Sequence, residues 1–336
     1  MPDRAEDATT SARRGTGTPA AHGLDEMVTR LGLEAAIQRL RDSIDRWIAQ
    51  SEPEIQEDLR WQFQAGSKYF RPITVFCCHR AVRAEPIADD LVRIAQLVEM
   101  FHNVSLIIDD IVDESTHRRG KPTLHARFGM LRALMVAGYI VADGYGMLAA
   151  DTSRDPAEIR YDSKLFSELM KRLGVAECVQ WRQRRRPLGV SDWRAIAEED
   201  TGSMFEVSAC LGGHSEALRR FGRLLGVLYH GCDDVGDVRG AQALGGGGEE
   251  DLRDGILTLP AALAIRDPQI SRIFCKDDPS PDDLKMLALA FANQLPEAEQ
   301  QLDAIAQEAR SEASRCSNSP DALYALIDYT RELSRR

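Results

Sequence analysis

The sequence predicts an all-α fold, a single-domain helical bundle. Apolar residues recur every three or four positions in several long stretches, which is the period of an amphipathic helix, and alternating strand patterns are hard to find. Alanine and leucine are plentiful, whereas aromatic residues make up only 6% of the 336 residues, which also favours helix. The 43% share of hydrophobic residues is enough for a substantial core.

The helical period is clearest in four stretches, which in chain order are 23–50, 88–112, 130–150 and 222–238. Breakers rich in glycine, proline or charge separate the helical runs, at 118–123, 152–158, 184–192 and 245–255. None of these segments resembles a linker between domains, so we expect one helical domain over residues 23–336. Residues 1–22 have no apolar core, and we interpret them as a disordered leader and not as a secretory signal.

Composition argues against several classes of function. A net charge of −11 makes nucleic acid an improbable partner, and the basic run at 181–189 is interpreted as a solvated loop or helix end. No run reaches the roughly 18–20 apolar residues that a membrane span requires, so we expect no membrane protein. Seven scattered cysteines without a CxxC pair predict reduced thiols in a cytoplasmic protein and no zinc site.

An acidic motif that occurs twice is the main clue to function. In LIIDDIVDES, residues 106–115, three aspartates follow an apolar segment, and the same DDxxD spacing returns in CDDVGDV. The two clusters are Asp109, Asp110 and Asp113, and Asp233, Asp234 and Asp237. If Asp makes up about 6% of residues, one DDxxD arises by chance in roughly 0.07 of chains of this length. One copy could be a solvated helix face, but two copies in apolar helices indicate a function.

Helix geometry gives these aspartates a common direction. Residues i and i+4 lie on one face of a helix, with i+1 about 100° round, so each motif presents oxygens from two successive turns. Ligand sets made only of oxygen suit Mg²⁺ or Mn²⁺, which complete their coordination with water and substrate phosphates. Two such clusters facing each other would bind a diphosphate through metal ions and stabilise it as a leaving group. That would also compensate the cost of burying carboxylates.

Four motifs together resemble a known family. GSKYFRP, EMFHNVSLIIDDIVDESTHRRGKPT, CDDVGD and DLRDGILTLP are similar, in order and spacing, to the trans-type polyprenyl diphosphate synthases, which include farnesyl and geranylgeranyl diphosphate synthases. The resemblance covers roughly residues 60–330. It implies the all-helical isoprenoid synthase fold with a central cavity, usually in a homodimer. It also implies that the two aspartate clusters bind three Mg²⁺ with the allylic diphosphate.

The resemblance assigns roles to further residues. Those matching the positions that hold isopentenyl diphosphate are Gly66, Lys68, Arg71, His102 and Arg119. Arg118 matches an arginine that holds the allylic diphosphate. The implied reaction ionises the allylic diphosphate to a carbocation, which the double bond of isopentenyl diphosphate attacks before a proton is lost.

Several positions depart from the family pattern. Asp200, Gly246 and Ile256 stand where the family usually has lysine, His230 stands in place of glutamine, and Tyr139 in place of aspartate. The lost lysines remove positive charge from the allylic side, whereas the residues for isopentenyl diphosphate are retained, which favours chain elongation. Two alternatives stay open: a terpene cyclase on the same fold, and a non-catalytic regulatory subunit of a prenyl diphosphate synthase.

The residues before Asp109 bear on product length. Val104 and Ser105 lie about 6–7.5 Å below Asp109 along the helix, and both are too small to stop a growing chain. Phe101 lies about 12 Å below Asp109 and is either the floor of the cavity or simply part of the core. Tyr139 could also narrow the cavity. We expect geranylgeranyl diphosphate, C20, as the product, with C15 and C25 as alternatives.

Overall fold

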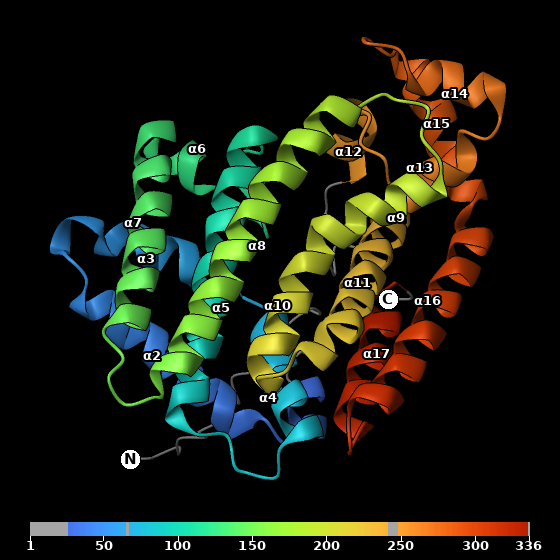
Figure 1. Ribbon diagram of the computed structural model, residues 1–336. Coiled ribbons are helices and arrows are strands. Elements are labelled where there is room, and N and C mark those ends of the chain that lie inside the picture. Colours follow the sequence, from blue (N-terminus) through green and yellow to red (C-terminus); the bar gives the residue numbers. More distant parts are fainter. Residues whose placement is uncertain (1–25, 65–66, 241–247, 335–336) are drawn as a thin grey trace, which may run out of the picture.

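The computed structural model describes residues 26–64, 67–240 and 248–334, and it confirms the all-α prediction (Figure 1). The helices are α2 (Glu34–Gln50), α3 (Pro53–Phe63), α4 (Phe70–Val82), α5 (Asp89–Val112), α6 (Leu124–Phe128), α7 (Met130–Ala149), α8 (Pro156–Gln183), α9 (Val190–Glu199), α10 (Thr201–Gly213), α11 (Arg219–Val238), α12 (Gly248–Asp254), α13 (Leu259–Ala264), α14 (Pro268–Phe274), α15 (Pro281–Asn293), α16 (Leu295–Cys316) and α17 (Asp321–Leu333). A short hairpin of β1 (His117–Arg118) and β2 (Lys121–Pro122) follows α5. The predicted leader, 1–22, lies outside the described residues.

The core of the molecule is built around helices α4, α5, α10 and α11. Helices α2, α3 and α7 lie on one side of them and α16 and α17 on the other (Figure 1). Helices α10 and α11 approach each other closely because glycines line their contact. A Cβ atom on Gly222 would lie 2.6 Å from the carbonyl oxygen of Phe205, and one on Gly226 would lie 2.6 Å from Cα of Gly202. This packing fixes α11, and with it the second acidic motif, against the core.

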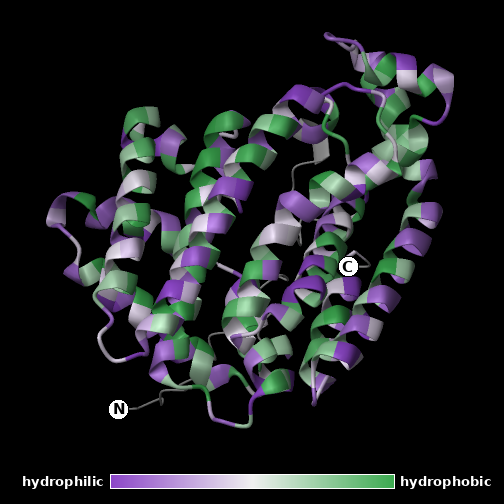
Figure 2. Cartoon of the chain, in the orientation of Figure 1, coloured by the Kyte–Doolittle hydropathy of each residue, from purple (hydrophilic) through white to green (hydrophobic). Residues whose placement is uncertain are grey.

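Two helices, α5 and α7, are long and apolar enough to cross a membrane by length and composition alone. In α5, 78% of the most apolar window is buried inside the molecule, as expected of a core helix. In α7 the corresponding share is 33%, because one face packs on α5 and the other faces outward. Figure 2 shows α7, at the left of the molecule, in mainly green and pale colours.

A buried carboxylate joins three helices behind the core. Glu206 of α10 is fully buried and accepts hydrogen bonds from Arg172 of α8 (3.1 Å) and Arg223 of α11 (2.8 Å). Arg219 of α11 also donates to it. Burial raises the pKa of Glu206, but the hydrogen bonds and charges of these arginines outweigh that effect and bring the pKa below its ordinary value. Glu206 therefore stabilises the packing of α8, α10 and α11.

We expect Glu206→Gln to lower the free energy of unfolding by about 3 kcal/mol, because it removes one partner of a buried ion cluster. This value lies at the lower end of the usual cost of breaking a buried ion pair, since the three arginines are only partly buried. Urea unfolding followed by circular dichroism at neutral pH measures the change. Glu54→Gln, at an exposed position of α3, is the control and should cost less than about 0.5 kcal/mol.

The difference between wild type and Glu206→Gln should also depend on pH. Because the pKa of Glu206 is lowered in the folded state, its contribution is fully present above the ordinary pKa of 4.5. It is lost as the pH falls through the folded-state pKa. Equal unfolding free energies for Glu206→Gln and Glu54→Gln would contradict the assigned role.

Candidate active site

Both acidic motifs line one cavity of about 270 Å³. Asp109 and Asp113 reach it from the end of α5, and Asp233, Asp234 and Asp237 reach it from the end of α11. The predicted convergence of the two motifs is therefore present in the structure. Asp110 is the exception: it is 3% exposed and points away from the cavity, into a small crevice behind it.

The position of the motifs at helix ends makes this cavity strongly attractive to cations. The C-terminus of a helix carries a partial negative charge, and both motifs occupy the last turns of their helices. Burial together with Glu177, Asp200 and Asp113 raises the pKa of Asp109. Burial raises the pKa of Asp233 to about 6, against the opposing effect of Lys68. Carboxylates so placed need positive partners to remain ionised.

The middle aspartate of each motif is held by the protein itself. Arg118 donates from Nε to Oδ1 of Asp110 at 2.7 Å. Asp234 accepts at Oδ2 from Trp193 Nε1 and from the backbone N–H of Leu259, both at 2.8 Å. Each middle aspartate therefore anchors its helix end and sets the direction of its neighbours. Asp110 is a positioning residue in this structure.

The remaining carboxylates fit a divalent cation that shares its ligands with phosphate. Oδ1 of Asp233 is buried and has no hydrogen-bond partner among the described residues. In the same part of the chain, no three His, Cys, Asp or Glu side chains converge closely enough to bind an ion alone. Mg²⁺ binds in this manner, through one or two carboxylates, several waters and substrate phosphates. The donor set of the cavity therefore fits Mg²⁺ together with a phosphorylated ligand.

A tight hairpin directs two arginines toward the acidic groups. In the antiparallel pair β1–β2, the turn residues Arg119 and Gly120 both have positive φ, 53° and 75°. This is the backbone of a type I′ turn, which strains a residue other than glycine at the first position. The turn lets Arg118 fold back onto Asp110 while Arg119 lines the cavity. Both arginines predicted from the sequence therefore lie at the site.

Arg71 and Arg119 form a cationic wall of the cavity, with the ring of His102 next to Arg71. Nη1 of Arg71 lies 3.1 Å from Nε2 of His102, and because a guanidinium only donates, Nε2 accepts and Nδ1 carries the proton. Burial and the neighbouring arginines lower the pKa of His102, so the ring is neutral. Nε of Arg71 and Nδ1 of His102 are buried donors without a hydrogen-bond partner within the described chain. Donors left in this state suit an anionic ligand.

Lys68 is a further cation near these groups. Burial and the charges of Arg119 and Arg71 lower the pKa of Lys68 to about 8, against the opposing effect of Asp233 and Asp237. Lys68 thus interacts electrostatically with the arginines and with the second acidic motif, although it is not among the residues that line the cavity. Gly66, predicted from the same sequence motif, lies outside the described residues.

Two of the atypical positions form one cluster. His230 lies with Nδ1 3.5 Å from Asp200 and Nε2 3.8 Å from Asp234. Burial lowers the pKa of His230, but the charges of Asp234, Asp200 and Asp233 outweigh it and raise the pKa. Thr201 donates to Asp200 at 3.2 Å. Ile256 also lines the cavity, whereas Gly246 lies outside the described residues.

Several residues of the cavity wall were missed by the sequence analysis. They are Glu177, Gln180, Trp181, Arg184 and Asp251. The basic run at 181–189 contains the end of α8, as predicted, and is solvated at Arg182 and Arg186. The interpretation is wrong for Arg184, whose side chain is only 18% exposed and lines the cavity, while Trp181 lines the cavity and is still 56% exposed. The three-residue spacing of Glu177 and Gln180 on α8 was a usable signal, because it places both on one helix face.

The predicted chain-length residues divide between the cavity and the core. Ser105 lines the cavity, whereas Val104 is 3% exposed and packs in the core. Phe101 is fully buried below Ser105, with its ring 4.8 Å from Phe166 and 5.3 Å from Tyr145. Tyr139 is not among the residues lining the cavity. Its hydroxyl donates to Glu52 on the outer surface.

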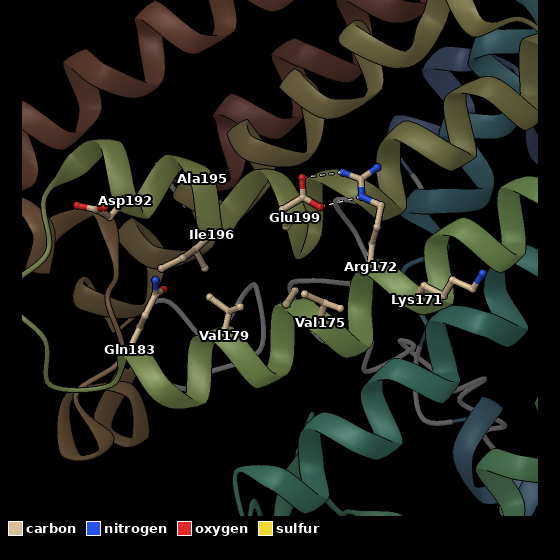
Figure 3. A pocket seen from close by; sticks show the side chains of 10 residues that line it. Lys171, Arg172, Val175, Val179, Gln183, Asp192, Ala195, Ile196 and Glu199 are labelled. Atoms are coloured by element: carbon tan, nitrogen blue, oxygen red, sulfur yellow. Dashed lines mark hydrogen bonds and ion pairs between the residues drawn. The ribbon is translucent and has the colours of Figure 1, made fainter.

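A second cavity lies on the other side of α8, between α8 and α9 (Figure 3). It is larger, about 400 Å³, and apolar, with Val175, Val179 and Ile196 pointing into it and the Arg172–Glu199 ion pair at one end. None of its lining residues belongs to the acidic motifs or to the cationic wall. We therefore place the chemistry at the acidic cavity.

Comparison with known proteins agrees with this geometry. A family model described as polyprenyl synthetase matches residues 52–291, well over half of the chain. The chain belongs to the polyprenyl synthetase family. It is therefore a prenyltransferase of isoprenoid biosynthesis.

Relatives within the family differ in the length of their named products. The chain is 27% identical to nonaprenyl diphosphate synthase of Mycobacterium tuberculosis, covering 91% of this chain and 95% of that one. It is 28% identical to geranylgeranyl pyrophosphate synthase 4 of Arabidopsis thaliana, covering 68% and 65%. Among solved structures, a polyprenyl synthase from Caulobacter crescentus complexed with calcium and isoprenyl diphosphate superimposes with a TM-score of 0.80. That match has 22% identity over 96% and 99% of the two chains and shows the shared fold.

Proposed function

We propose that this polyprenyl synthetase condenses isopentenyl diphosphate with an allylic diphosphate in the cytoplasm, with Mg²⁺ as its cofactor. The observation that carries the proposal is one cavity lined both by carboxylates of the two acidic motifs and by Arg71 and His102, which keep buried, unsatisfied N–H donors. Three Mg²⁺ per site, as the family resemblance implies, belong to the proposal, and Mn²⁺ could replace them. The seven cysteines are all free thiols, which agrees with a reducing compartment.

Different residues would bind each of the two diphosphates. Asp109, Asp113, Asp233 and Asp237 would hold the metal ions, which neutralise the leaving diphosphate when they are bound. Arg71, His102, Arg119 and Lys68 would bind the diphosphate of isopentenyl diphosphate and orient its double bond toward the allylic carbon. Arg118 keeps Asp110 in place and is near enough to the cavity to contact the allylic diphosphate. Packed walls of α5, α8 and α10 would exclude water from the carbocation.

The cationic wall favours elongation over cyclisation. A cyclase acts on one diphosphate and has no use for a second anion site, yet Arg71 and His102 keep buried donors that no described residue satisfies. The carboxylates lining the cavity in both motifs argue against a purely regulatory subunit.

Product analysis tests the function. With Mg²⁺, isopentenyl diphosphate and an allylic primer, the wild type should yield a longer prenyl diphosphate by mass spectrometry. Asp109→Asn and Asp233→Asn should each reduce turnover by about 100-fold or more, because each removes a ligand of the metal ions that would stabilise the leaving diphosphate. The control is Asp282→Asn, at an exposed position of α15, which should leave turnover unchanged.

Other outcomes identify the alternatives. A hydrocarbon or terpene alcohol released without isopentenyl diphosphate would identify a cyclase. If the folded protein gives no product with any primer, whether metal is added or not, this would identify a regulatory subunit and would overturn the proposal.

We also propose that the product is C20, geranylgeranyl diphosphate. Ser105 and Phe101 lie four and eight positions before Asp109 and so share its helix face, with Phe101 about 12 Å below. The rings of Phe101, Tyr145 and Phe166 come from three helices and close the space beneath Ser105. A longer chain would have to displace this aromatic floor. C15 and C25 remain the alternatives.

We expect Phe101→Ala to shift the main product from C20 to C25 or longer, because it opens space below Ser105. Phe101→Leu keeps more of the core volume and should shift part of the product, which protects the test if the alanine variant is unstable. Mass spectrometry of the products gives the chain length. Phe274→Leu, a buried ring of α14 away from the cavity, is the control. Unchanged product length in both Phe101 variants would remove Phe101 from the floor.

A homodimer through α7 completes the proposal. The outward face of α7 carries Leu131, Leu134 and Met135, which are 73%, 40% and 61% exposed. Farther along the same face come Gly138, Ala142, Gly146 and Ala149, also exposed. A Cβ atom on Gly138 or Gly146 would meet nothing within 4 Å. A face of large apolar residues followed by small ones suits close packing against the α7 of a second copy.

Leu131→Glu should convert the dimer to monomer by placing charge among the large apolar residues at the N-terminal end of this face. Mass photometry at nanomolar concentration or sedimentation measures the change, with Leu289→Glu, at a 65% exposed leucine of α15, as the matched control. A wild-type protein that is monomeric at micromolar concentration, or a Leu131→Glu variant that stays dimeric, contradicts the interface.

A further inference from the structure

Arg184 is the C-cap residue directly after α8 and lies in the wall of the acidic cavity. Its Nη2 donates to Oδ1 of Asp113 at 2.6 Å, and Nη1 lies 3.9 Å from Asp254. The guanidinium also lies over the ring of Trp181, 4.4 Å from its centre. The side chain is 18% exposed, so Arg184 is a charged group of the cavity and not a solvated surface residue.

The backbone around Arg184 is fixed to the segment that follows the second acidic motif. Arg185 has a φ of 57°, which turns the chain sharply after Arg184. Its backbone N–H donates to the carbonyl of Gly255 at 2.9 Å, and its side chain donates to the carbonyl of Arg253. Arg184 is thereby held between the first acidic motif and the segment next to Ile256.

The charge around Arg184 differs from the family pattern described above. Asp200 and Ile256, which replace two common lysines, line the same cavity as Arg184. Burial together with Asp200 and Asp113 raises the pKa of Glu177, which lines the same cavity, to about 7, and Arg184 opposes the rise. Arg184 and Asp200 therefore act on the same carboxyl group, about two helical turns before Arg184.

The protein contacts of Arg184 leave part of its guanidinium unused. Nε is buried and has no hydrogen-bond partner among the described residues. The Asp113 partner is itself one of the carboxylates expected to bind metal. A guanidinium paired with a metal-binding carboxylate is available for phosphate as soon as that carboxylate takes a cation, and its planar fork matches phosphate oxygens.

We propose that Arg184 binds the terminal phosphate of the allylic diphosphate and replaces the positive charge lost at Asp200. The inference rests on the proposed function and assigns one further residue to the allylic site. In the absence of substrate Arg184 pairs with Asp113. With metal on Asp113, Arg184 turns its donors to the phosphate, and its attachment through Arg185 keeps it within reach.

Arg184→Gln tests the proposal. The KM for the allylic diphosphate should rise about tenfold or more, because a charge-assisted hydrogen bond is lost, while the KM for isopentenyl diphosphate changes less than twofold. Calorimetric binding of farnesyl thiodiphosphate, an allylic analogue that ionises slowly, in the presence of Mg²⁺ should weaken by the same factor without turnover. Arg186→Gln, an exposed arginine of the same run, is the control and should change neither quantity.

Two further variants separate charge from structure. Arg184→Lys keeps the charge and should retain most of the allylic affinity. Asp200→Lys in the Arg184→Gln background should recover at least about threefold in the allylic KM, since it restores a cation at the family position. Circular dichroism and the unfolding midpoint check that each variant is folded.

The possible results distinguish this inference from the proposed function. If the wild type makes no prenyl diphosphate, the proposed function fails. If the wild type is active and Arg184→Gln leaves the allylic KM unchanged, or raises both KM values equally, only the role of Arg184 is overturned. Tighter binding of the thiodiphosphate by Arg184→Gln would also overturn it, because Arg184 would then hinder binding by keeping Asp113 from the metal ion.

Discussion

The burial of facing carboxylates at two helix ends is the constraint on which the rest of the structure depends. Asp109 and Asp113 at the end of α5, and Asp233 and Asp237 at the end of α11, add to the partial negative charge of the helix termini. Like charges brought together in this way destabilise the fold unless cations surround them. The close packing of α10 on α11 and the burial of α5 hold the clusters in place against this repulsion.

In both copies of the motif, helix geometry gives the middle aspartate a different role from the first and the last. The first and last aspartates of each copy lie on one face and reach the cavity, whereas the middle one is about 100° round the helix, which turns Asp110 out of the cavity and leaves Asp234 in its wall. That turn brings Asp110 to Arg118, and it brings Asp234 to Trp193 and the backbone of Leu259. Anchoring costs a potential ligand in the first motif, where Asp110 points away from the cavity. In exchange, the directions of the other two are set before any metal binds.

Much of this architecture could be predicted from the sequence, for reasons that are local. The 3.6-residue period predicted the helices, and the spacing of Asp109 and Asp113 predicted that the two side chains share one helix face. Glycine at position 120 marked the tight turn beside Arg119. The position of Arg184 could not be predicted in the same way, because it depends on the hydrogen bond from Arg185 to Gly255, a contact across 70 residues. A basic run has the same local pattern whether it faces water or a cavity.

The unusual residues of the allylic side make sense as one charge arrangement. Asp200, in place of a lysine, adds a carboxylate to a cavity that several other acidic side chains already line. His230 stands beside it in place of a glutamine, and the surrounding carboxylates favour its protonated form. Arg184, directly after α8, is a second cation in the wall of the same cavity. With Arg184 at the allylic site, as we propose, the positive charge lost at Asp200 would be supplied from the end of α8 and by His230 of α11, which is what a site that must still hold a diphosphate requires.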